Sequence, residues 1–153
     1  MSNDDKELKA RYDSIATTGD YRTTASDFQL REIEIDTGAA YIQDGMMTLD
    51  VGCGLGYAVS QYALRFNVKA HGIDYSENMV TGAQELLKKN FPDIESRVLF
   101  SHASVLELPY PDNSFDVVTS HRCLMALLDW EKQKLAIREI HRVLKPGGVL
   151  VLM

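Results

Sequence analysis

The spacing of apolar residues changes near residue 46, from an irregular first part to a regular alternation of predicted strands and helices. Short apolar runs bounded by turn residues predict five strands, at residues 46–51, 68–73, 98–100, 115–119 and 149–153. Between them, apolar residues recur at helical spacing after residue 57, after Ser76 and after Asp129, and the latter two are suitable helix N-caps. The predicted buried stripe of the last helix is Ala136, Ile137, Ile140, Val143 and Leu144.

The first 44 residues are predicted to form a separate N-terminal helical segment. One helix is predicted over residues 6–16 and a second from about Ser26 to Ile42. The apolar positions of the second helix are less regular than a helical stripe requires; they are Phe28, Leu30, Ile33 and Ile35. The predicted organisation is a helical segment or lid at 1–44, followed by one domain at 45–153.

Strands that alternate with helices predict one fold class. Such βαβ units predict an α/β fold with a doubly wound, mainly parallel, Rossmann-like sheet and helices on both faces. Pro146, Gly147 and Gly148 are expected to end the last helix before the fifth strand. Ligands of such sheets bind outside the carboxyl ends of the strands, where the strand order reverses.

Composition narrows the classes of partner. With 16 basic and 22 acidic residues, the 153-residue chain has a net charge of −6, and its densest basic cluster is only Lys88-Lys89, so we expect no nucleic-acid partner. No apolar run approaches the roughly 18 residues of a membrane span, and the polar N-terminus lacks a signal-peptide core. Cys53 and Cys123 form no CxxC motif and indicate reduced thiols in a cytoplasmic protein. The histidines show no spacing that predicts a metal site.

A glycine-rich stretch follows the first predicted strand, in residues 49–56 (LDVGCGLG). Its three glycines, Gly52, Gly54 and Gly56, suit a tight strand-to-helix turn whose backbone amides face a ligand. Asp74 ends the next predicted strand, where a carboxylate can accept hydrogen bonds from a ribose diol. A plain strand–turn–helix connection is the alternative for a lone GxG, and the combination with Asp74 argues against it.

The position of the third glycine separates two classes of adenosine cofactor. A nicotinamide or flavin pattern, GxGxxG, would need glycine at position 57, where this chain has Tyr57. The GxGxG pattern after Asp50 instead resembles class I S-adenosylmethionine-dependent methyltransferases, over about residues 45–153. Residues 108–116 (LPYPDNSFD) are similar to the small-molecule branch of this family, which includes quinone-biosynthesis methyltransferases.

The resemblance implies S-adenosylmethionine as cofactor and a set of binding residues. Tyr75 and Met79 would flank the adenine, although Met79 also fits the buried stripe of its helix. Ser104 stands where the family usually has an acid that contacts the adenine amino group, so backbone groups near Val105 would carry more of that recognition. The complete predicted cofactor set is Asp50, Gly52, Cys53, Gly54, Gly56, Asp74, Tyr75, Met79, Ser104 and Val105.

The implied reaction is methyl transfer to a small-molecule acceptor. Such a reaction needs alignment and exclusion of water, and a general base only where the acceptor starts protonated. His121, after the fourth predicted strand, is the candidate for a base or acceptor-orienting group, and a surface or backbone-bonded histidine is the alternative. Tyr21 and Arg22 are candidates to cover the methionine end of the cofactor.

The family sheet usually has seven strands in the order 3-2-1-4-5-7-6, whereas this sequence ends at Met153, with the fifth predicted strand. One explanation is a piece of a longer methyltransferase. A second is a homodimer that pairs through the exposed edge of that strand. A third is a non-catalytic cofactor-binding or interaction module. A nicotinamide oxidoreductase is a lesser alternative function, and Tyr57 argues against it.

Overall fold

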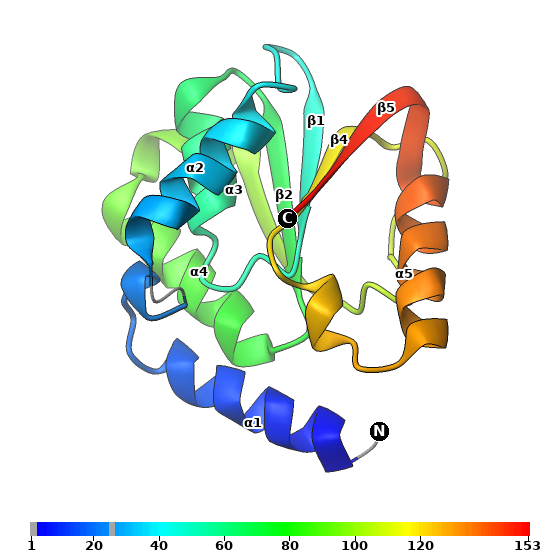
Figure 1. Cartoon of the computed structure of the whole chain (residues 1–153). Coiled ribbons are helices and arrows are strands. Elements are labelled where there is room, and N and C mark those ends of the chain that lie inside the picture. The colour runs from blue at the N-terminus through cyan, green and yellow to red at the C-terminus, as the bar shows by residue number, and fades with distance from the viewer. Residues whose placement is uncertain (1–2, 25–26) are drawn as a thin grey trace.

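Five parallel strands form one sheet, in the order β3-β2-β1-β4-β5, in the computed structural model, which describes residues 3–24 and 27–153 (Figure 1). The strands are β1 (Met47–Val51), β2 (Lys69–Asp74), β3 (Val98–His102), β4 (Phe115–Ser120) and β5 (Leu144–Leu152). The α-helices are α1 (Asn3–Ala16), α2 (Phe28–Ala39), α3 (Tyr57–Arg65), α4 (Glu77–Asn90) and α5 (Trp130–Val143). Short 3-10 helices are η1 (Tyr21–Thr24), η2 (Pro92–Arg97) and η3 (Leu124–Ala126). The predicted doubly wound α/β class is confirmed.

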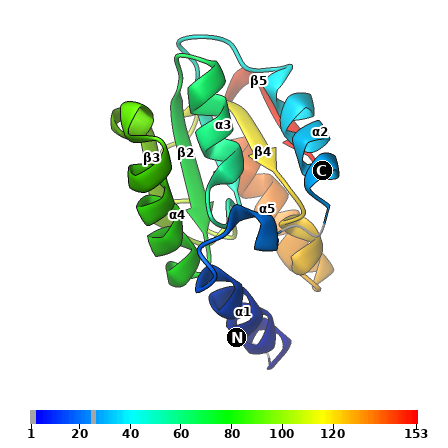
Figure 2. The same cartoon turned by 90° about the vertical axis from the view of Figure 1, so that its left-hand side faces the viewer.

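Two layers of helices enclose the sheet. Helices α2, α3 and α4 lie over one face and α5 lies over the other, while α1 crosses below the carboxyl ends of the strands (Figures 1 and 2). The core between the sheet and helices α2, α3 and α4 includes Ile35, Tyr62 and Val117. The core under α5 includes Leu49 and Ile140. Burial on both faces explains why the strands read as nearly continuous apolar runs.

Two helix starts follow the predicted capping chemistry. The Ser76 side chain accepts a hydrogen bond from the Met79 amide at 3.2 Å and begins α4. The Asp129 carboxylate accepts hydrogen bonds from two amides in the first turn of α5. Helix α2 begins at Phe28 with Asp27 as its N-cap, and the predicted start at Ser26 lies outside the described residues.

Two predicted details are wrong. Ile137 is 38% exposed, although the predicted stripe of α5 included it, because the buried face is narrower and centres on Ala136, Ile140 and Val143. The last strand begins at Leu144 and not at residue 149, since Leu144 pairs with Phe115 before the register shifts. The segment that includes Pro146 and Gly147 therefore lies within β5 as an irregularity.

Strand β5 is the last in the sheet, so one of its edges has no neighbouring strand among the described residues. Val151 is buried in the core under helices α2, α3 and α4, whereas Leu152 is 52% exposed. In the part of the chain that the structure describes, no helix has the length and apolar character that crossing a bilayer demands.

Candidate functional site

A cavity of about 520 Å³ opens at the carboxyl ends of the strands, where the strand order reverses between β1 and β4. Its volume lies within the range of about 300–1,000 Å³ that is usual for small-molecule sites. Asp50 of β1 and Thr119 of β4 are paired in register at this point. The two strands thus bring polar side chains from distant parts of the sequence together, and Asp50 lines the cavity.

The glycine loop forms one side of the cavity. Gly52, Gly54 and Gly56 all have a left-handed backbone, with φ of 77°, 54° and 79°. A Cβ atom on Gly52 would lie 2.5 Å from the Cβ of Cys123, so no larger residue fits there without displacement of its neighbour. Gly52, Cys53 and Gly54 line the cavity with backbone that a ligand can approach closely.

Asp74 joins the glycine loop to the end of β2. Its Oδ2 accepts a hydrogen bond from the Gly54 amide at 2.8 Å, and its Oδ1 accepts one from the Ser76 amide at 2.9 Å. Burial raises the pKa of the Asp74 carboxyl above its usual range. A carboxylate has about four acceptor positions, and three backbone hydrogen bonds, from Gly54, Tyr75 and Ser76, leave Asp74 able to accept one from a ligand hydroxyl such as that of a ribose.

The wall next to Asp74 combines a half-exposed ring with buried apolar groups. Tyr75 lines the cavity and its ring lies 6.3 Å from that of His102, while Met79 and Val105 are buried beside the same space. Ser104 also lines the cavity, and its Oγ accepts a hydrogen bond from the Leu106 amide at 3.2 Å. These four predicted adenine-side residues are brought together on one wall.

Gly56 differs from the other predicted cofactor residues because it does not line the cavity. A Cβ atom at this position would lie 2.3 Å from Cζ of Phe100, and its left-handed backbone precedes the first turn of α3. The glycine is therefore required by packing and helix geometry, and the structure places it outside the cavity wall.

The two cysteines lie in the wall as free thiols. Burial raises the pKa of Cys123 to about 12 and also raises the pKa of Cys53 well above its ordinary value. Both thiols therefore remain protonated at neutral pH, which makes them space-filling groups rather than nucleophiles.

His121 also lines the cavity and directly follows β4. Its Nε2 is 3.2 Å from the hydroxyl oxygen of Tyr62 and 3.7 Å from Oδ1 of Asp50. The Thr119 hydroxyl donates a hydrogen bond to the same Asp50 oxygen at 2.8 Å. Burial raises the pKa of Asp50, an effect that the nearby His121 opposes, and burial also raises the pKa of Tyr62. The imidazole is thus held by a buried polar cluster.

The predicted cover by Tyr21 and Arg22 is not what the structure shows. The Tyr21 ring packs 5.1 Å from the Tyr57 ring, Arg22 pairs with Asp20, and neither Tyr21 nor Arg22 lines the cavity. Five other residues of the N-terminal segment do so: Lys9 and Tyr12 of α1, and Arg31, Glu34 and Ile35 of α2. The one available sequence signal was the i, i+3 spacing of Arg31 and Glu34, which places both on one helix face.

Arg122 is a further cavity residue that the sequence did not single out. Its Nε and Nη2 donate hydrogen bonds to the Glu34 carboxylate at 2.9–3.0 Å, so the pair joins the loop after β4 to α2. Its backbone is left-handed, with φ of 59°, which is uncommon for a residue with a long side chain. The described residues contain no group of three or more His, Cys, Asp or Glu placed to hold a metal ion.

Comparison with known proteins identifies the family of the chain. The family described as "Methyltransferase domain" matches residues 49–152. The chain is 40% identical over 116 residues to 27-O-demethylrifamycin SV methyltransferase of Amycolatopsis mediterranei, which covers 75% of the chain and 40% of that protein. It is 39% identical over 111 residues to demethylmenaquinone methyltransferase of Listeria welshimeri, covering 71% of the chain and 44% of that relative.

Solved structures show the same fold. The [4+2]-cyclase SpnF aligns with a TM-score of 0.73 and 35% identity, over 81% of this chain and 44% of the cyclase. Haemonchus contortus phosphoethanolamine N-methyltransferase 2, in complex with phosphomonomethylethanolamine and S-adenosylhomocysteine, aligns with a TM-score of 0.68 and 31% identity, over 80% of this chain and 27% of that one. The chain belongs to the methyltransferase domain family and spans less than half the length of these relatives.

Proposed function

We propose that this chain binds S-adenosylmethionine and transfers its methyl group to a small-molecule acceptor in the cytoplasm. The observation that carries the proposal is the shared cavity of the left-handed glycine loop, the partly buried Asp74 carboxylate and His121. The free thiols Cys53 and Cys123 are in keeping with a reducing compartment. Family membership supports the cofactor, since the aligned Haemonchus structure contains S-adenosylhomocysteine.

Different residues of the chain would bind different parts of the cofactor. Asp74 would accept a hydrogen bond from a ribose hydroxyl, while Tyr75, Met79, Ser104 and Val105 would enclose the adenine. The backbone of Gly52–Gly54 leaves room for the methionine part. When bound, S-adenosylmethionine supplies an activated methyl group on a positively charged sulfur.

Other residues of the cavity would act on the methyl acceptor. His121 would orient the acceptor and take up a proton where the acceptor carries one, with Tyr62 and Asp50 fixing the plane of its ring. Helices α1 and α2 contribute Lys9, Tyr12 and other groups over the cavity, so residues 1–44 would act as a lid on a binding domain at 45–153.

Turnover tests this proposal, because one aligned relative is a cyclase and the fold alone does not determine the reaction. The chain is incubated with S-adenosylmethionine and a panel of phenols, amines and carboxylates, and the products are analysed by mass spectrometry. Formation of a methylated product together with S-adenosylhomocysteine is expected. Cofactor binding without turnover on any acceptor would favour the rival role of a non-catalytic binding module.

The free edge of β5 supports a second, structural part of the proposal. An edge strand with an exposed Leu152 can add a neighbouring strand, so two copies of the chain would pair through β5. Light scattering during size-exclusion chromatography should give twice the chain mass of 17.2 kDa. A monomer across the micromolar range would remove the dimer from the proposal.

A further inference from the structure

Cationic side chains line the cavity although the chain as a whole carries a net charge of −6. They are Lys9, Arg31, Arg122 and Lys132, and Lys9 pairs with Asp13 at 2.7 Å. S-adenosylmethionine would add the positive charge of its sulfonium, since its ammonium and carboxylate offset each other. Cationic groups within a concave site favour a ligand with negative charge.

Arg122 has the geometry of a group that binds such a ligand. Glu34 takes up the Nε and Nη2 donors of the guanidinium. The Nη1 amino group of Arg122 forms no hydrogen bond with any of the described residues, which leaves its donors available. The Arg122 side chain is 34% exposed and lines the cavity, so these donors are accessible from it.

The backbone of Arg122 is strained in a way that serves this placement. Its φ of 59° lies in the left-handed region, which is unfavourable for a residue with a side chain. The Arg122 amide donates a hydrogen bond to the Met153 carbonyl at 2.7 Å, and Glu34 holds the other end of the residue. Strain that neighbouring groups maintain in this way is often found at functional sites.

We propose that Arg122, oriented by Glu34, is the acceptor-binding residue, and that the acceptor carries a carboxylate or phosphate group. A planar guanidinium matches the paired oxygens of either anion. Because Arg122 and His121 both line the cavity, an anion bound at Nη1 would hold the acceptor in the space that the imidazole also faces. This inference rests on the proposed function, of which it specifies the substrate class.

The test compares anions with uncharged molecules of similar shape. Benzoate is paired with benzamide, and phenyl phosphate with phenol, and dissociation constants are measured by calorimetry at constant ionic strength with and without S-adenosylhomocysteine. Wild-type protein should bind at least one anion about tenfold more tightly than its neutral counterpart, the order expected for a charge-assisted hydrogen bond. The arm that shows the preference identifies carboxylate or phosphate, and equal binding in both arms would overturn the proposal.

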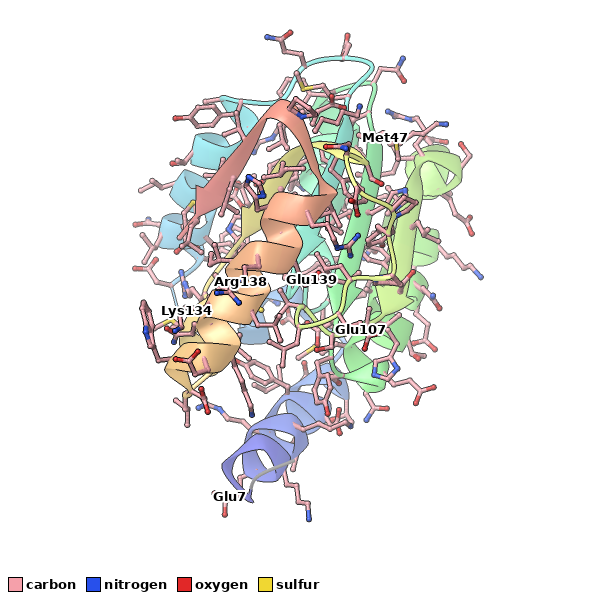
Figure 3. All side chains as sticks on the ribbon, turned by 90° about the vertical axis from the view of Figure 1, so that its right-hand side faces the viewer. Glu7, Met47, Glu107, Lys134, Arg138 and Glu139 are labelled. Carbon is pink, nitrogen blue, oxygen red and sulfur yellow. The ribbon has the colours of Figure 1, made fainter. Side chains whose placement is uncertain are left out.

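Variants separate recognition from stability. Arg122→Met should abolish the preference for the anion, whereas Arg138→Met, which removes an exposed arginine of α5, should preserve it (Figure 3). Because Arg122→Met leaves the largely buried Glu34 unpaired, the double variant Glu34→Gln/Arg122→Met provides a second measurement without an isolated charge. Persistence of the preference in a folded double variant would overturn the assignment of Arg122.

The cofactor arm keeps the two proposals distinguishable. Failure of S-adenosylhomocysteine to bind wild-type protein would count against the proposed function, whatever the anions do. Binding of S-adenosylhomocysteine without any anion preference would overturn only the assignment of the acceptor class.

Discussion

At the scale of single residues, left-handed backbone positions shape the cavity. Gly52 and Gly54 expose backbone to the ligand, whereas Gly56 makes room for the Phe100 ring. Sequence reasoning recognised the three glycines as one motif, but it could not separate their tasks. The difference depends on Phe100 of β3, which only the folded sheet brings to Gly56.

Replacement of Gly56 by alanine should destabilise the fold more than replacement of Gly45. Both positions are left-handed, but a Cβ atom at Gly56 would clash with Phe100, while Gly45 has no atom within 4 Å of that point. Gly45→Ala should lower the free energy of unfolding by about 1–2 kcal/mol, the cost of the backbone alone. Gly56→Ala should lower the free energy of unfolding by about 1–3 kcal/mol more than Gly45→Ala does, because of overpacking. Urea denaturation measures both, and equal losses would contradict the packing role.

Removal of the His121 imidazole should slow methyl transfer and leave cofactor binding intact. His121→Ala deletes the group, and Tyr62→Phe deletes only the hydroxyl that lies 3.2 Å from Nε2. We expect Tyr62→Phe to lower kcat by a smaller factor with little change in KM, because Tyr62 positions the ring and does not reach the acceptor. Steady-state kinetics and S-adenosylhomocysteine titration provide the readouts. Unchanged turnover in His121→Ala would exclude the residue from the reaction.

At the scale of elements, α5 anchors the loop that leads from Val105 to β4. Arg142 donates hydrogen bonds to the Tyr110 and Leu108 carbonyls at 2.7 and 2.9 Å. Glu139 accepts one from the Leu108 amide at 2.8 Å and pairs with Arg142. The Leu108–Asp116 stretch was recognised from sequence as a family feature, but its anchoring was not, because Glu139 and Arg142 read as solvent-facing positions of a helix.

The anchor predicts a specific dependence of stability on pH. Hydrogen bonds from Arg142 lower the pKa of Glu139 from 4.5 to about 2, so its contribution is complete above pH 4.5 and is lost as the pH falls towards 2. Glu139→Gln should therefore destabilise the protein at pH 7, and its difference from wild type should shrink between pH 4.5 and 2.

The control is Glu131→Gln on the same helix, where an exposed pair with Lys134 contributes little. Denaturation midpoints at several pH values provide the measurement. A deficit of Glu139→Gln that stays constant down to pH 2 would contradict the anchoring role of the charge.

At the scale of the whole molecule, the elements of the sheet and the glycine-loop side of the cavity were predictable, whereas the opposite contributions from the N-terminal helices were not. The succession of strands and helices, the caps and the glycine loop follow from short-range patterns, while the strand order was implied by the family resemblance. The cavity also joins Lys9, Arg31 and Arg122, which are distant in sequence. Their convergence depends on how α1 and α2 pack on the sheet, and the irregular apolar pattern of α2, with Ile33 62% exposed, carries little of that information.

We expect the cavity to bind S-adenosylmethionine through Asp74, and calorimetric titration measures this binding. Wild-type protein should bind S-adenosylmethionine and S-adenosylhomocysteine at one site and should give no binding heat with NAD. Asp74→Asn should weaken S-adenosylhomocysteine binding by about tenfold or more, since it loses charged acceptors, while Asp93→Asn, on the exposed surface of η2, should match wild type. Binding of NAD alone, or equal affinities in Asp74→Asn and wild type, would contradict the account.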